Sequence, residues 1–63
     1  MPLNTKNNIA DADGFYANLL ATHHGLSLAE SHALNARLVL ILANHIGDTP
    51  VLSEAMALAR DGS

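Results

Sequence analysis

The stretch from Leu28 to Ile46 limits the possible folds of this chain more than any other part of it. It opens in "LSLAES", where Ser27 and Glu30 have the spacing of a capping box, each side chain reaching the backbone amide of the other residue. Gly47 follows and can adopt the left-handed conformation that ends a helix. We therefore predict one long helix over residues 28–46, the longest element of the chain.

Apolar side chains cover most of the circumference of this predicted helix, at about 100° per residue. The main stripe contains Leu34, Leu38, Ile41, Leu42 and His45. A second stripe contains Ala36, Val39, Ala43 and Ile46. A narrow polar stripe contains Glu30, Arg37 and Asn44. A helix with so much apolar surface is expected to lie at the centre of the fold.

Two shorter helices flank it. Residues 12–24 place Phe15, Tyr16 and His23 on an apolar arc. Asp11 or Asp13 can serve as the N-cap of this predicted helix, and Gly25 can end it. Residues 50–60 follow Thr49, which can cap, and Pro50, which suits the first helical position. We predict an all-α three-helix mini-bundle over residues 11–61, preceded by a flexible arm at residues 1–10.

A chain of this size is expected to have low stability on its own, because a domain of about 60 residues buries only about 60% of the surface of its unfolded form. We therefore expect an additional source of stability. The 63-residue sequence has no cysteine, so disulfides cannot supply this. If the flanking helices cover the main stripe, the second stripe is left for an interface. The interface candidates are Ala36, Val39, Leu40, Ala43, Ile46, Leu58, Tyr16 and His45.

Composition disfavours several classes of partner. Three basic side chains against six carboxylates leave no patch for several phosphates, so we expect neither nucleic acid nor an anionic membrane as partner. The start carries no apolar run typical of a secretory signal, and the longest apolar run, residues 38–43, is far shorter than the roughly 20 residues that span a bilayer. We expect a cytoplasmic protein.

The four histidines, His23, His24, His32 and His45, do not form a ligand pattern, because no pair has the i, i+3 or i+4 spacing of helical metal sites. In a helical hairpin, His23 and His45 are separated by about 25 Å at 1.5 Å per residue. No nucleophile with an oxyanion donor is evident, so we expect no catalytic site, metal or cofactor. An oligomer could still bring histidines of two chains together.

The segments "ADADGFYANLL", "LSLAESHALNARLVLILANHIGD" and "VLSEAMA" together resemble the small bacterial proteins grouped as domain of unknown function 2783. The resemblance covers residues 3–59, and residues 34–48 are its most specific part. It implies that the gene lies near flavin-dependent enzymes of aromatic breakdown. It provides no catalytic residues.

We therefore expect a non-catalytic helical interaction module. It would self-associate or act as a small accessory subunit of a larger enzyme, for which the resemblance suggests a flavin-dependent one acting on aromatic compounds. The alternative is a small metal-binding or ligand-binding protein whose histidines assemble across an oligomer.

Overall fold

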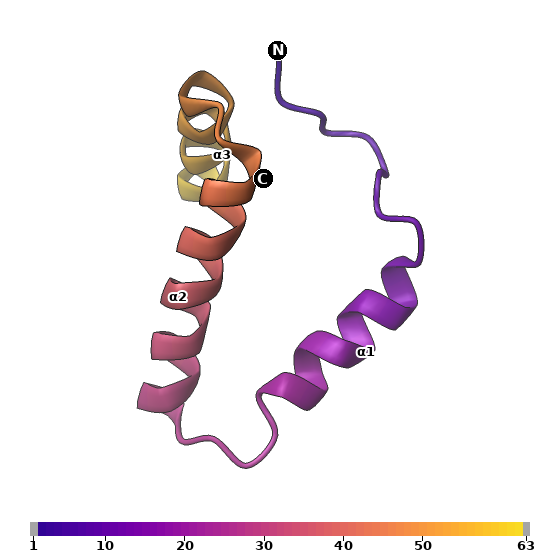
Figure 1. Cartoon of the computed structure of the whole chain (residues 1–63), viewed down its shortest axis with the longest axis vertical. Coiled ribbons are helices and arrows are strands. Elements are labelled where there is room, and N and C mark those ends of the chain that lie inside the picture. The colour runs from indigo at the N-terminus through magenta and orange to yellow at the C-terminus, as the bar shows by residue number, and fades with distance from the viewer. Residues whose placement is uncertain (1, 63) are drawn as a thin grey trace.

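The computed structural model describes residues 2–62, which form three helices joined by short turns (Figure 1). The helices are α1 (Ala12–Thr22), α2 (Leu28–Ile46) and α3 (Thr49–Asp61). No strand occurs between residues 2 and 62. The predicted all-α, three-helix fold is confirmed.

Both ends of α2 are set by local bonds. The Ser27 hydroxyl accepts from the Glu30 amide at 3.2 Å, and the Glu30 carboxylate accepts from the Ser27 amide at 2.9 Å. At the other end Gly47 has φ +72°, and its amide donates to the Ala43 carbonyl at 2.9 Å. The predicted bounds are confirmed at both ends because each signal depends only on residues within one turn.

Helix α1 begins as predicted and ends two residues early. The Asp11 carboxylate accepts from the Gly14 amide at 3.0 Å, which makes Asp11 the cap, while Asp13 lies in the first turn. The amides of His23 and His24 bond to carbonyls three residues back, at 3.1 Å each, so the last turn tightens and the α-helix ends at Thr22. Gly25, with φ +79°, then turns the chain.

The predicted start of α3 is wrong by one residue, because Asp48 rather than Thr49 is the N-cap. Asp48 has an extended backbone, and its carboxylate accepts from the Val51 amide at 3.1 Å. Thr49 and Pro50 thus occupy the first two helical positions. Pro50 remains compatible there, since its missing amide is one of those without an intrahelical acceptor. The helix extends to Asp61, and Gly62 caps it with φ +77°.

The three helices are arranged openly. Helices α1 and α2 diverge from the turn at residues 23–27, and α3 lies at the far end of α2 (Figure 1). Val51, at 6% exposure, is the one buried apolar residue in the described part of the chain. The expected packing of both shorter helices over the main stripe is therefore wrong: Ile41 stays 64% exposed and Leu42 48%.

The open arrangement leaves far more surface than a folded monomer of this mass has. A compact monomer of 6.6 kDa exposes roughly 3,900 Å² by the size scaling of folded proteins. The chain exposes 5487 Å², which is roughly 1,600 Å² in excess of that scaling. The secondary structure is complete, but the tertiary burial is not.

Candidate interaction surface and the histidine corner

The interface candidates are open to solvent with one exception. Ala43 is half-buried, while the seven others, Ala36, Val39, Leu40, Ile46, Leu58, Tyr16 and His45, are exposed. Val39 and Leu40, at 63% and 70% exposure, are among the most exposed apolar side chains of α2. His45 is not covered by α3, although it lies on the main stripe.

The main stripe of α2 adds to this surface, which the sequence did not indicate. Leu34 and Leu38, nearer the α1 corner, are half-buried, whereas Ile41 and Leu42 further along are exposed. On α1, Leu19 is half-buried and Phe15 keeps 46% exposure. Among these six side chains, burial therefore decreases with distance from the corner.

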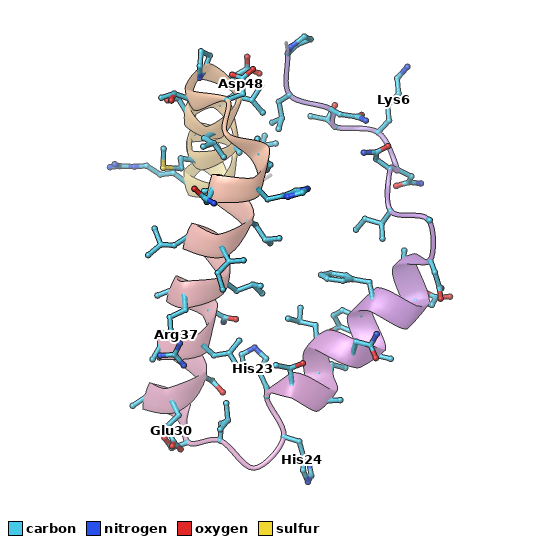
Figure 2. The ribbon with its side chains drawn as sticks, viewed as in Figure 1. Lys6, His23, His24, Glu30, Arg37 and Asp48 are labelled. Atoms are coloured by element: carbon cyan, nitrogen blue, oxygen red, sulfur yellow. The ribbon has the colours of Figure 1, made fainter. Side chains whose placement is uncertain are left out.

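A polar cluster at the corner joins α1 to α2. His23, the residue that ends α1, is directed toward α2, while His24 points away (Figure 2). The His23 Nδ1 atom lies 3.0 Å from the Ser31 hydroxyl, and its Nε2 atom lies 3.0 Å from the Asn35 side-chain oxygen. Because that amide oxygen can only accept, Nε2 carries the proton, and in the neutral ring Nδ1 accepts from Ser31. One side chain thus fixes two successive turns of α2.

This cluster superficially resembles a base-activated serine, since Ser31 can donate to a histidine whose other nitrogen is bonded. Acyl-transfer chemistry also requires amides directed at the developing oxyanion. Two backbone amides of this turn are already used: Ser31 donates to the Ser27 carbonyl at 2.9 Å, and Glu30 donates to the Ser27 hydroxyl at 3.2 Å. The arrangement is suited to holding the corner.

Sequence reasoning placed His23 on an apolar arc and did not find its partners. The available signal was Ser31 and Asn35, two polar residues four apart on one face of a predicted helix, just after the turn that follows His23. The remaining histidines, His24, His32 and His45, are exposed. Within residues 2–62 no group of three or more potential metal-binding side chains is found.

Charge on this surface is sparse. Glu30 and Arg37 of α2 lie apart from His23 (Figure 2). Hydrogen bonds from Ser27, chiefly from its backbone amide, hold the pKa of the Glu30 carboxyl below its ordinary value of 4.5. This favours the charged form of the residue that completes the cap of α2.

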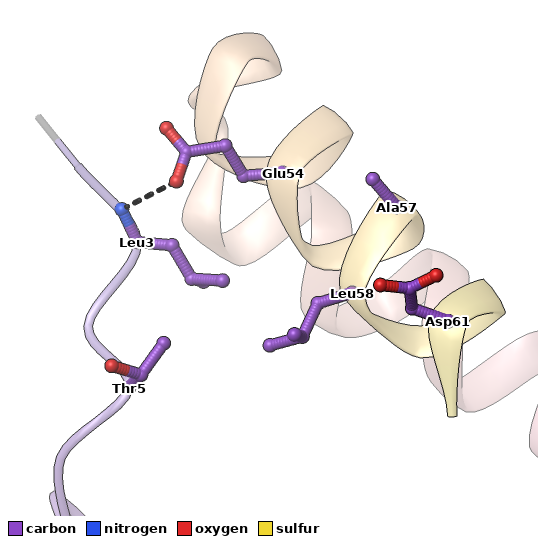
Figure 3. Close-up of a pocket in the computed structure, with 6 residues that line it drawn as sticks. All are labelled: Leu3, Thr5, Glu54, Ala57, Leu58 and Asp61. Atoms are coloured by element: carbon purple, nitrogen blue, oxygen red, sulfur yellow. Dashed lines mark hydrogen bonds between the residues drawn. The ribbon is translucent and has the colours of Figure 1, made fainter. Parts of the chain in front are cut away.

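The N-terminal arm touches the opposite end of the molecule. The Leu3 amide donates to the Glu54 carboxylate at 3.4 Å, and the half-buried Leu3 side chain lines a shallow hollow with Leu58 and Ala57 of α3 (Figure 3). The predicted flexibility of residues 1–10 stays a prediction; residue 1 lies outside the described residues.

Comparison with known proteins gives one result. A family profile described as "Protein of unknown function (DUF2783)" matches residues 3–61. No curated protein and no solved structure matches the chain. In the described part of the chain, no helix is long and apolar enough to cross a membrane.

Proposed function

This chain belongs to the DUF2783 family of proteins of unknown function, and we propose that it is a non-catalytic helical interaction module that completes its fold by self-association. The observation that carries this proposal is the surface left open by three well-formed helices. Helix ends are capped by specific residues, so the helices are defined, yet Val51 alone is buried among the apolar residues described.

The size of the open surface fits an assembly. A standard interface buries about 800 Å² on each partner, and permanent homodimers bury about 2,000–5,000 Å² in total. The excess of roughly 1,600 Å² per chain corresponds to roughly 3,200 Å² for a pair, within the range of a permanent dimer. The apolar part of such an exposed area is unfavourable in water, at about 25 cal/mol per Å² of apolar surface.

The residue types also favour this role. The exposed side chains of α2 include Val39, Leu40, Ile41 and Leu42, consecutive residues that between them occupy most of its circumference. Soluble monomers rarely expose a continuous apolar area of this kind, whereas interfaces use it. The polar cluster around His23 is suited to a structural role, because the amides of Ser31 and Glu30 are engaged.

The same surface would serve an accessory subunit of a larger enzyme. The resemblance described above favours a flavin-dependent enzyme of aromatic breakdown as that partner, in the cytoplasm. Affinity capture with the native chain from its own cells tests this form. A stoichiometric enzyme in the captured material supports it, and recovery of the chain alone contradicts it.

Sedimentation equilibrium of the purified 63-residue chain tests the proposed function directly. We expect a dimer or a larger assembly at micromolar concentration, with helix content that decreases on dilution, because folding and association are then linked. A monomer that keeps full helix content and unfolds cooperatively would contradict the proposal.

A further inference from the structure

The corner cluster identifies which side of α2 faces α1. Because His23 bonds to both Ser31 and Asn35, the face of α2 that carries these two residues is directed toward α1. Residues three, four and seven positions apart share a helix face. Leu38 and Leu42 follow Asn35 by three and seven positions, so they continue this face toward the far end of α2.

A matching row runs along α1. Leu19 and Phe15 precede His23 by four and eight positions, so they lie on the side of α1 that turns toward α2. Both rows are half-buried near the corner and open further away, where Phe15 has 46% and Leu42 48% exposure. The rows therefore diverge, as the two ribbons do in Figure 1.

Within residues 2–62, the remaining elements are held elsewhere in the fold. Helix α3 is joined to α2 by only Gly47 and Asp48 and is capped by Asp48, which fixes it at the far end. The arm is bonded to α3 through Leu3 and Glu54. None of Phe15, Leu19, Leu38 and Leu42 carries a charge, so a partner here must be apolar.

We propose that a second copy of this chain fills the space between the facing sides of α1 and α2, so that the α1 and α2 helices of two copies form a four-helix core around a two-fold axis. This inference rests on the proposed function and specifies its surface. The six side chains that define the surface are Phe15, Leu19, His23, Leu34, Leu38 and Leu42.

Two observations favour a second copy over an unrelated protein. The unburied area per chain lies within the range that each member of a permanent dimer contributes. In a dimer with a two-fold axis, the α1 row of each copy contacts the α2 row of the other copy. The same apolar contact then forms twice, which is the self-complementary interface of symmetric dimers. Two helical hairpins then give the layer geometry of a four-helix bundle.

Two leucines on α2 offer a matched test. Leu42 belongs to the inner row, whereas Leu40 has 70% exposure and points about 160° away from Leu42 at 3.6 residues per turn. Leu42→Ala and Leu40→Ala remove the same atoms from the same helix and introduce the same strong helix former. The dimer dissociation constant of the full chain is measured by sedimentation for each, with circular dichroism of helix content alongside.

The expected effects differ clearly. About half of the burial of Leu42 remains to be gained, and a symmetric dimer gains it twice, so Leu42→Ala should raise the dissociation constant about 10- to 100-fold. Leu40→Ala should change it by less than about threefold, since Leu40 lies on the side of α2 away from the proposed four-helix core, where substitutions have small effects. Phe15→Ala, on the other helix, should weaken the dimer as Leu42→Ala does.

Each remaining outcome decides a different point. The inner surface is not the interface if the wild-type chain is dimeric but Leu40→Ala weakens the dimer as much as Leu42→Ala does. The same conclusion follows if Phe15→Ala leaves the dimer unchanged. In both cases only this inference fails, and the proposed function stands. If the wild-type chain is a stable monomer at all concentrations, the proposed function fails and this inference with it. If Leu42→Ala loses helix content, the Phe15→Ala result decides.

Discussion

Replacing His23 with leucine tests whether the corner cluster stabilises the fold. The substitution removes the bonds to Ser31 and Asn35 and keeps a side chain of similar bulk. A net hydrogen bond contributes about 0.5–1.5 kcal/mol. The bond to Ser31 is partly buried and the bond to Asn35 is exposed, so the second belongs at the low end. We expect a loss of about 1–2 kcal/mol in the free energy of unfolding.

His24→Leu is the matched control, because His24 is adjacent, exposed and directed away from α2 (Figure 2). Urea unfolding followed by circular dichroism, at one fixed chain concentration, measures both variants, since stability of an assembling chain depends on concentration. In thermal unfolding the His23→Leu loss corresponds to a decrease of about 4–8 °C per kcal/mol. Equal stability of the two variants would refute the assignment of His23 as the residue that holds the corner.

Three further predictions concern the helix ends. Asp48→Ala should lower the free energy of unfolding by about 0.5–2 kcal/mol and Thr49→Ala by less than about 0.5 kcal/mol, because the carboxylate of Asp48 accepts from the Val51 amide. Urea unfolding of both variants gives the comparison, and a larger loss for Thr49→Ala would contradict the observed cap. Gly47→Ala should lower the free energy of unfolding by about 1–2 kcal/mol, since the φ of +72° at this position strains any residue with a Cβ. Urea unfolding measures this loss, and an unchanged midpoint would exclude a left-handed Gly47. The hydrogen bonds that lower the pKa of Glu30 in the folded state stabilise α2 while the carboxylate is charged. This contribution is present above pH 4.5 and is lost as the pH falls below that value. In a titration followed by circular dichroism, Glu30→Gln should lose less helix content in acid than the wild type, and identical curves would contradict this expectation.

The long helix could be predicted from the sequence because its limits depend on neighbours in the chain. Ser27 and Glu30 bond to each other, and Gly47 bonds within one turn, so no distant residue needs to be known. At the start of α3 two adjacent residues, Asp48 and Thr49, can both cap, and the preference for Asp over Thr at an N-cap is too small to fix the first residue of the helix. The backbone of Asp48, with φ −96° and ψ 101°, decides between them.

The candidate surface could be predicted only in part. The second stripe was identified from its apolar pattern, and its exposure is consistent with that prediction, but the pattern does not say which of two stripes the other helices cover. That depends on the angle between α1 and α2, which the bonds of His23 fix through Ser31 and Asn35. A histidine on an apolar arc gave no sign of this role.

The mass of the native assembly tests the central claim most directly. Sedimentation equilibrium of the wild-type chain at micromolar concentration should give twice the 6.6 kDa of the single chain, with dissociation and loss of helix content on dilution. A particle of 6.6 kDa that retains its helices and unfolds in one cooperative transition would contradict the claim that this fold is completed by a second copy.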